Sequence, residues 1–137
     1  MMIETILVPT DGSEHAQRAA AHAIALAERE DAALHALYVV NTDDLGEPAL
    51  SSAEILVTEA EERGRNVLAA VAAAARTRGV PVETTCVHGE PAEMIKEHAD
   101  EVGADLVMLG KRGETHELRE GTVTRQLRRD DDRVVIV

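Results

Sequence analysis

The chain has 137 residues, about the length of one domain, and 45% of them are hydrophobic, which is enough to bury a core. Its formal net charge is −12, from 26 acidic and 14 basic residues. Such a surface repels nucleic acid and anionic membranes, so we expect neither as a partner. The same acidity is typical of adaptation to a high-salt (halophilic) cytoplasm, where ions screen the self-repulsion.

Cysteine content and hydropathy exclude further classes. Cys86 is the only cysteine, which excludes an internal disulfide and a multi-cysteine zinc site. The sequence has no signal-peptide pattern and no apolar run of membrane-spanning length. We therefore expect a cytoplasmic protein that forms a single domain over residues 1–137.

Apolar runs of strand length alternate along the chain with longer stretches of helical periodicity. In chain order, the sequence predicts a strand at 3–8, a helix at about 13–29, a strand at 33–40, a helix at about 52–78, a strand at 81–87, a helix at 91–102, a strand at 104–109, a short helix after Gly121 and a strand at 133–137.

Residues typical of helix ends agree with these bounds. Ser51 and Glu54 have the spacing of a capping box, and Pro91 stands in a predicted first turn. Gly79 and Gly103 follow helical stretches, where a left-handed cap is common. Near-continuous apolar strands joined by helices indicate α/β architecture. With right-handed crossovers, we expect a five-stranded, doubly wound parallel sheet with helices on both faces, a Rossmann-like fold.

In such a sheet, ligands bind beyond the carboxyl ends of the strands, near the point where the strand order reverses. This rule selects residues 9–13, 39–41 and 110–113. Asp11 ends the first of these strands. Its carboxylate could cap the following helix, or bond a sugar hydroxyl, a base amine or a metal ion on phosphates.

The segment after the fourth strand has features of a phosphate site. Gly110 and Gly113 allow close backbone approach, and residues 121–124 (GTVT) open a helix whose N-terminus favours phosphate. The two threonine hydroxyls can add hydrogen bonds. Basic residues also gather in this part of the chain and would attract a polyphosphate, although for Arg128 and Arg129 we prefer a solvated helix face. They are Lys111, Arg112, Arg119, Arg125, Arg128 and Arg129.

Two long stretches resemble the universal stress protein family. The opening ETILVPTDGSEHAQRAAAHAIALA is similar to the family's first strand, PTDGS turn and first helix, and HGEPAEMIKEHADEVGADLVMLGKRG to its stretch through the fourth strand. The family's nucleotide signature is Gly, two residues, Gly, nine residues, then Gly-Ser or Gly-Thr. Gly110, Gly113 and Gly121 match it, with seven residues in place of the nine.

The resemblance implies that the chain binds ATP, AMP or ADP, with Mg²⁺ on the phosphates. Pro9, Thr10 and Asp11 would approach the base and ribose, and Val39 would pair with adenine through its backbone. The ribose and phosphates would contact Leu109, Gly110, Arg112, Gly113, Gly121, Thr122, Val123 and Thr124. Which residue would hold the metal stays open. No general base is evident, so any ATP hydrolysis is expected to be slow.

The leading hypothesis is a nucleotide-dependent switch in a stress response, with an unidentified protein partner. Occupancy would order the polar segment 41–50 and residues 114–120. The resemblance suggests a homodimer in which the edge strand from Arg133 to Val137 pairs with its copy. The alternative is a dimeric scaffold of the same fold that binds no nucleotide. The seven-residue spacer favours the alternative, and the retained Pro9-Thr10-Asp11 and three glycines favour the switch.

Overall fold

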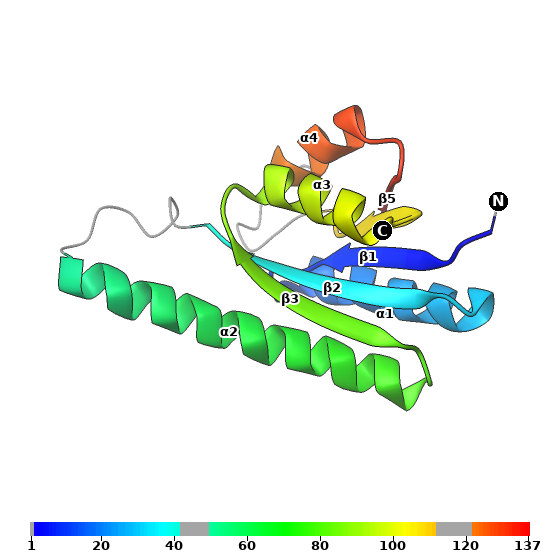
Figure 1. Ribbon diagram of the computed structural model, residues 1–137, viewed down its shortest axis with the longest axis horizontal. Helices are drawn as coiled ribbons and strands as arrows, with labels where there is room; N and C mark the ends of the chain where they lie inside the picture. Colours follow the sequence, from blue (N-terminus) through cyan, green and yellow to red (C-terminus); the bar gives the residue numbers. More distant parts are fainter. Residues whose placement is uncertain (1, 42–49, 112–121) are drawn as a thin grey trace.

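The computed structural model describes residues 2–41, 50–111 and 122–137. Its centre is a five-stranded sheet in the order β3-β2-β1-β4-β5, and every neighbouring pair is parallel (Figure 1). The predicted doubly wound parallel sheet is therefore confirmed. The strands are β1 (Thr5–Pro9), β2 (Ala33–Val40), β3 (Val82–His88), β4 (Leu106–Leu109) and β5 (Val134–Ile136).

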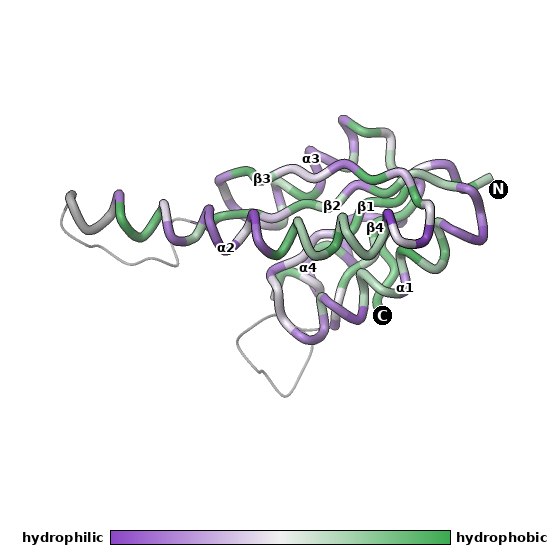
Figure 2. The backbone as a smooth tube through the Cα atoms, turned by 90° about the horizontal axis from the view of Figure 1, so that it is seen from below, coloured by the Kyte–Doolittle hydropathy of each residue, from purple (hydrophilic) through white to green (hydrophobic). Residues whose placement is uncertain are grey.

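Helices cover both faces of the sheet, as the sequence predicts. They are α1 (Glu14–Glu30), α2 (Leu50–Thr77), α3 (Pro91–Val102) and α4 (Thr122–Asp130). Alternation along β1 shows how the two faces arise: Ile6 and Val8 enter one core with α1 and α2, while Leu7 enters the other with α3 and α4. Figure 2 shows hydrophobic colour along the central strands β1 and β4.

Most predicted element ends are correct to within two residues, and the caps explain several of them. Ser13 is the N-cap of α1, and its hydroxyl oxygen accepts a hydrogen bond from Ala16 N–H at 3.2 Å. Gly79 and Gly103 adopt positive φ after α2 and α3, as expected. The capping-box prediction for Ser51 is wrong, because α2 begins at Leu50 and Ser51 lies inside the helix. Ser and Glu three residues apart also occur within a helix, so their spacing alone does not define its start.

The core is built from small side chains, which lets α1 lie close to the sheet. Its buried face is alanine except for Ile24. The one tyrosine, Tyr38, needs a notch in α2 at Gly64, where an added Cβ would lie 2.6 Å from Tyr38 Cδ1. The helix therefore contains a residue of poor helix propensity because the ring occupies the space of its side chain. Over the described residues, no helix is long and apolar enough to cross a membrane.

We expect Gly64→Ala to lower the melting temperature. Alanine gains about 1 kcal/mol of helix propensity, but overpacking against a ring typically costs about 1–3 kcal/mol. The control is Asn66→Ala, which alters an exposed position of the same helix and should be neutral or slightly stabilising. Adding Tyr38→Leu should remove most of the loss. Stabilisation by Gly64→Ala alone would contradict the contact.

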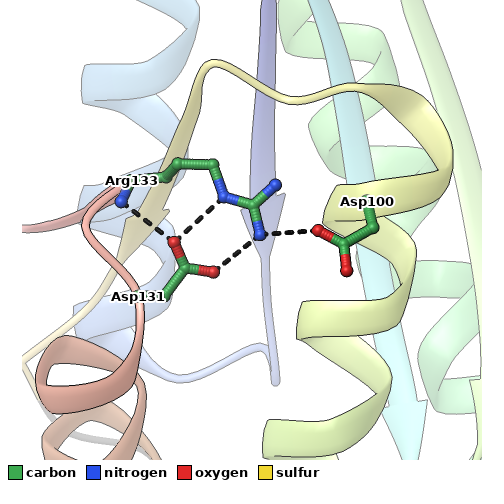
Figure 3. A network of polar contacts seen from close by, with 3 residues as sticks. All are labelled: Asp100, Asp131 and Arg133. Atoms are coloured by element: carbon green, nitrogen blue, oxygen red, sulfur yellow. Dashed lines mark hydrogen bonds and ion pairs between the residues drawn. The ribbon is translucent and has the colours of Figure 1, made fainter.

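Arg133 joins the last turn of the fold to α3. Its guanidinium donates two hydrogen bonds to Asp131, at 2.9 and 2.7 Å, and reaches Asp100 Oδ1 at 2.9 Å (Figure 3). The Asp131 side chain is only 7% exposed. Hydrogen bonding to Arg133 lowers the pKa of Asp131, and the same pairing raises the pKa of Arg133. This network holds the residue that precedes β5 against the body of the protein.

Replacing Arg133 by Gln should destabilise the protein at pH 7 by about 1–3 kcal/mol, since hydrogen bonds to charged groups are lost. Because the pKa of Asp131 is lowered on folding, its contribution is present above the unfolded pKa of about 3.9 and lost as pH falls through the folded value. The deficit of the variant should therefore shrink below about pH 4. Urea unfolding of the unaltered protein and the variant at a series of pH values measures this difference in the free energy of unfolding.

The matched control is Arg78→Gln, which breaks an ion pair with Glu28 at 2.9 Å between exposed side chains. It should cost less than about 1 kcal/mol. Equal losses for the two variants, or a deficit at position 133 that is independent of pH, would show that the network does not stabilise the fold as argued.

Candidate functional site

The strand order reverses between β1 and β4, so the carboxyl ends of these strands flank the crevice that the strand-end rule selects. Leu7 lies opposite Val107, and the same register places Pro9 beside Leu109. From here β1 leads to α1 on one face of the sheet, and α4 lies on the other (Figure 1). The structure therefore brings the ends of both strands to one place.

The Pro9-Thr10-Asp11 segment forms a tight turn into α1. Thr10 is 7% exposed, its N–H donates to Leu37 O at 2.8 Å and its hydroxyl oxygen accepts from Gly12 N–H at 3.2 Å. Asp11 Oδ1 accepts from Ser13 N–H at 2.9 Å, so Asp11 holds the turn while Ser13 caps the helix. Among the described residues, no partner is bonded to Asp11 Oδ2, which leaves that oxygen available to a ligand.

The backbone of Val39 is placed by a difference in strand length. Odd residues of β2 bond toward β1, as Leu37 O does with Thr10 N–H, and even residues bond toward β3, as Val40 O does with Gly89 N–H. The register with β1 ends at Leu37, whereas β2 continues to Val40. Val39 N–H and C=O therefore face the space beyond the end of β1, with no backbone partner among the described residues.

The fold itself requires a glycine at position 110. A Cβ at this position would lie 2.7 Å from the backbone carbonyl carbon and oxygen of His15, in the first turn of α1. Backbone atoms cannot move aside as a flexible side chain can, so only glycine lets β4 end this close to α1. The sequence predicts close approach of a ligand at Gly110, and the structure shows that another part of the protein also approaches it.

Thr124 also has a structural partner. Its side chain is buried, and its hydroxyl donates a hydrogen bond to Gly110 O at 2.9 Å. The single hydroxyl hydrogen is therefore committed to a carbonyl, and it is not free to bind phosphate in this arrangement. The predicted contact of Thr124 with a phosphate stays a prediction, and it would require the hydroxyl to leave this bond. The same bond ties the first turn of α4 to the end of β4.

Of the other predicted site residues, some are described by the structure and some are not. Leu109 is buried, and the half-buried Val123 packs against the same core, so their side chains belong to the core. Thr122 begins α4, which places a helix N-terminus beside the crevice. Arg112, Gly113 and Gly121, together with residues 42–49 and 114–120, lie outside the described residues, so their predicted roles stay predictions.

The basic residues that can be placed are exposed. Lys111 lies two residues after the end of β4, and Arg125 lies in the middle of α4. Arg128 and Arg129 occupy the last turn of α4, where cations interact favourably with the helix dipole. This supports the preference for a solvated helix face at those two positions. Within the described residues, no cluster of three or more His, Cys, Asp or Glu could hold a metal ion.

His15 is a residue of this region that sequence reasoning missed. It lies in the first turn of α1 beside Gly110, and its Nδ1 is buried without a hydrogen-bond partner among the described residues. It lies within the opening stretch that resembles the family, but nothing in that stretch marks its side chain as functional, and the six histidines of the chain are scattered. Only the packing of α1 against β4 could have indicated its position.

A doubly wound sheet with turns and helix N-termini at its switch point defines a class of α/β proteins, and three comparisons narrow that class. The family model for the universal stress protein family matches residues 2–130. Universal stress protein MJ0531 of Methanocaldococcus jannaschii is 37% identical over 115 residues, which is 83% of this chain and 68% of that protein. The chain belongs to the universal stress protein family.

Solved structures agree with this assignment. The structure of protein MJ0577 superposes with a TM-score of 0.92 at 25% identity, covering 100% of this chain and 96% of that one. A universal stress protein solved in complex with cAMP superposes with a TM-score of 0.66 at 26% identity, covering 100% of this chain and 98% of that one.

The bond between Thr124 and Gly110 can be tested through stability. Thr124→Val keeps the shape and leaves a buried carbonyl without its donor, so we expect a loss of about 1–3 kcal/mol. Thr77→Val is the control, since the Thr77 hydroxyl bonds Ala73 O on an exposed part of α2 and its loss should change stability by less than about 0.5 kcal/mol. Chemical denaturation measures both. Similar effects for the two would contradict a structural role for Thr124.

Proposed function

We propose that this protein binds an adenine nucleotide in the crevice between the ends of β1 and β4, and that it acts as a nucleotide-dependent regulatory protein. The observation that carries the proposal is the backbone of Val39, a donor and an acceptor side by side that have no backbone partner among the described residues. Family membership and the relative solved with cAMP support the same ligand class.

The Val39 backbone suits adenine. The outer edge of adenine presents an N1 acceptor and an N6 donor, which complement one N–H and one C=O. Guanine presents an N1–H donor and an O6 acceptor. In the same orientation, its donor would face the Val39 N–H and its acceptor would face the Val39 C=O. A site that leaves polar groups unpaired discriminates strongly against the wrong ligand. The proposal therefore predicts preference for adenine over guanine.

The remaining groups fit a ribose and phosphates. Asp11 Oδ2 is available to a ribose hydroxyl or to a cation, and the N-terminus of α4 supplies N–H groups and a partial positive charge. Because the chain has a net charge of −12, it repels a polyphosphate unless part of the phosphate charge is neutralised. Mg²⁺ bound to the phosphates would do this, because it prefers phosphate and carboxylate oxygens.

We further propose that two copies pair through β5. This strand lies at one edge of the sheet, and Val135 on it is 38% exposed. An open edge presents unpaired N–H and C=O groups, and pairing with its copy would cover them. The Arg133 network holds the start of that edge in place. A change at the crevice could reach a partner surface through α4, which precedes β5.

Calorimetric titration with Mg-ATP and Mg-GTP tests the nucleotide proposal. We expect heat with ATP and at least tenfold weaker binding of GTP. Asp11→Asn should weaken ATP binding, because it removes charge from Oδ2 while an amide oxygen can still accept from Ser13 N–H. Asp31→Asn, at the opposite end of α1, is the matched control and should leave affinity unchanged. Folding of each variant is checked by circular dichroism.

No heat at millimolar Mg-ATP, from protein shown to be folded, would favour the alternative of a scaffold that binds no nucleotide. The seven residues between Gly113 and Gly121, two fewer than in the family pattern, are the feature that keeps this alternative open. Equal affinity for ATP and GTP would refute the assigned role of Val39.

A further inference from the structure

The strand β3 forms the other edge of the sheet, and it is the longer of the two edges. It has seven residues, against three in β5 (Figure 1). Pro81 O and Gly89 N–H bond to β2, so alternation turns the N–H and C=O of Thr84 and Cys86 outward. Thr84 is exposed and Cys86 half-buried. Such an edge is a template for another strand.

A groove of about 380 Å³ lies between this edge and α2. Small residues of α2 form one side of it, and β3 forms the other. Its lining residues are Arg65, Leu68, Ala69, Ala72, Arg76, Thr84 and Cys86. Positions 65, 68, 69, 72 and 76 share one face of a helix, which explains why the lining is continuous. Alanines there leave room for the side chains of an added strand.

Two arginines mark the ends of the helical side of the groove. Arg65 and Arg76 are eleven residues apart, about 16 Å along a helix. Arg65 lies 3.9 Å from Glu61, whose other oxygen lies 3.6 Å from His88. No carboxylate among the described residues pairs with Arg76, which is exposed.

The carboxylate on β3 does not face the groove, and Glu61 at the Arg65 end is offset by Arg65. Glu83 is on β3, but it lies 3.7 Å from His35 Nδ1, and alternation places it on the opposite face of the strand from Thr84 and Cys86. Burial and Glu61 raise the pKa of the Cys86 thiol, so the middle of the groove is uncharged at neutral pH. The groove therefore has Arg76 at one end, without a carboxylate partner among the described residues, the Arg65–Glu61 pair at the other end, and a neutral centre, within a chain of net charge −12.

We propose that this groove binds an extended acidic segment of a partner protein, which adds to β3 as a further strand. Main-chain bonds to the open edge would supply affinity, and Arg65 and Arg76 would select acidic side chains. Residues of a strand rise about 3.3 Å each, and alternate ones share a face. Acidic residues four or six positions apart would therefore match the arginines.

The proposal does not depend on nucleotide binding. The nucleotide site uses the carboxyl ends of β1, β2 and β4, whereas the groove lies along the outer edge of β3 and is lined by residues of β3 and α2 only. Either activity can fail without the other. It is also distinct from the proposed pairing of β5, which is at the opposite edge of the sheet.

The test uses the full chain and a fluorescent peptide with blocked ends, Thr-Glu-Val-Ala-Val-Glu-Thr, whose glutamates are four positions apart. Anisotropy should show saturable binding, reduced at least tenfold when both glutamates are replaced by lysine. Arg76→Glu should weaken binding at least tenfold. Arg63→Glu, an exposed position of α2 outside the groove, should have at most a small effect. Equal effects of the two variants, each verified as folded, would overturn the proposal.

Strand addition makes a second prediction that charge attraction alone does not. Of two peptides N-methylated on alternate amides, one should lose binding at least tenfold and the other should retain it, because only one set of amides faces β3. Retention by both would overturn the proposal.

Cys86, the only cysteine, can show where the peptide binds. Saturating peptide should slow the alkylation of Cys86 by N-ethylmaleimide several-fold. An unchanged rate with bound peptide would place the peptide elsewhere and refute the site.

Discussion

The architecture depends on the contact between the end of β4 and the first turn of α1. At Gly110 the two backbones are so close that even a methyl group would lie 2.7 Å from carbonyl atoms. The hydroxyl of Thr124 bonds the carbonyl of the same glycine from the other face of the sheet. One residue thus joins a strand and two helix N-termini at the point where the strand order reverses. These elements therefore meet at the place where the strand-end rule puts a ligand.

Small side chains make that arrangement possible elsewhere in the fold. The chain has no Phe and no Trp, and alanines let α1 lie close to the sheet. Where the one tyrosine is placed, α2 has a glycine to receive its ring. The same small residues on α2 leave a groove beside β3. A core with a single aromatic residue therefore has a consequence for the surface, because helices with small side chains leave space at the edge of the sheet.

The proposed functions use backbone groups that the sheet leaves unpaired. At the centre, β2 is longer than β1, and Val39 presents a donor and an acceptor to the crevice. At the edges, β3 and β5 have one side without a neighbouring strand among the residues that the structure describes. These places differ in their surroundings: helix N-termini at the centre favour phosphate, and arginines beside β3 favour carboxylates. One sheet could therefore serve a nucleotide, a peptide and a second copy independently.

Periodicity and helix-end residues alone determined the element order, the parallel sheet and the segments 9–13, 39–41 and 110 at its carboxyl edge, because these follow from local pattern and general rules of chain connection. They could not show that the Thr124 hydroxyl bonds Gly110, nor that α1 fills the space a Gly110 side chain would need. They also could not place Arg65 and Arg76 beside the edge of β3. These features join residues distant in the chain, so only tertiary packing decided them.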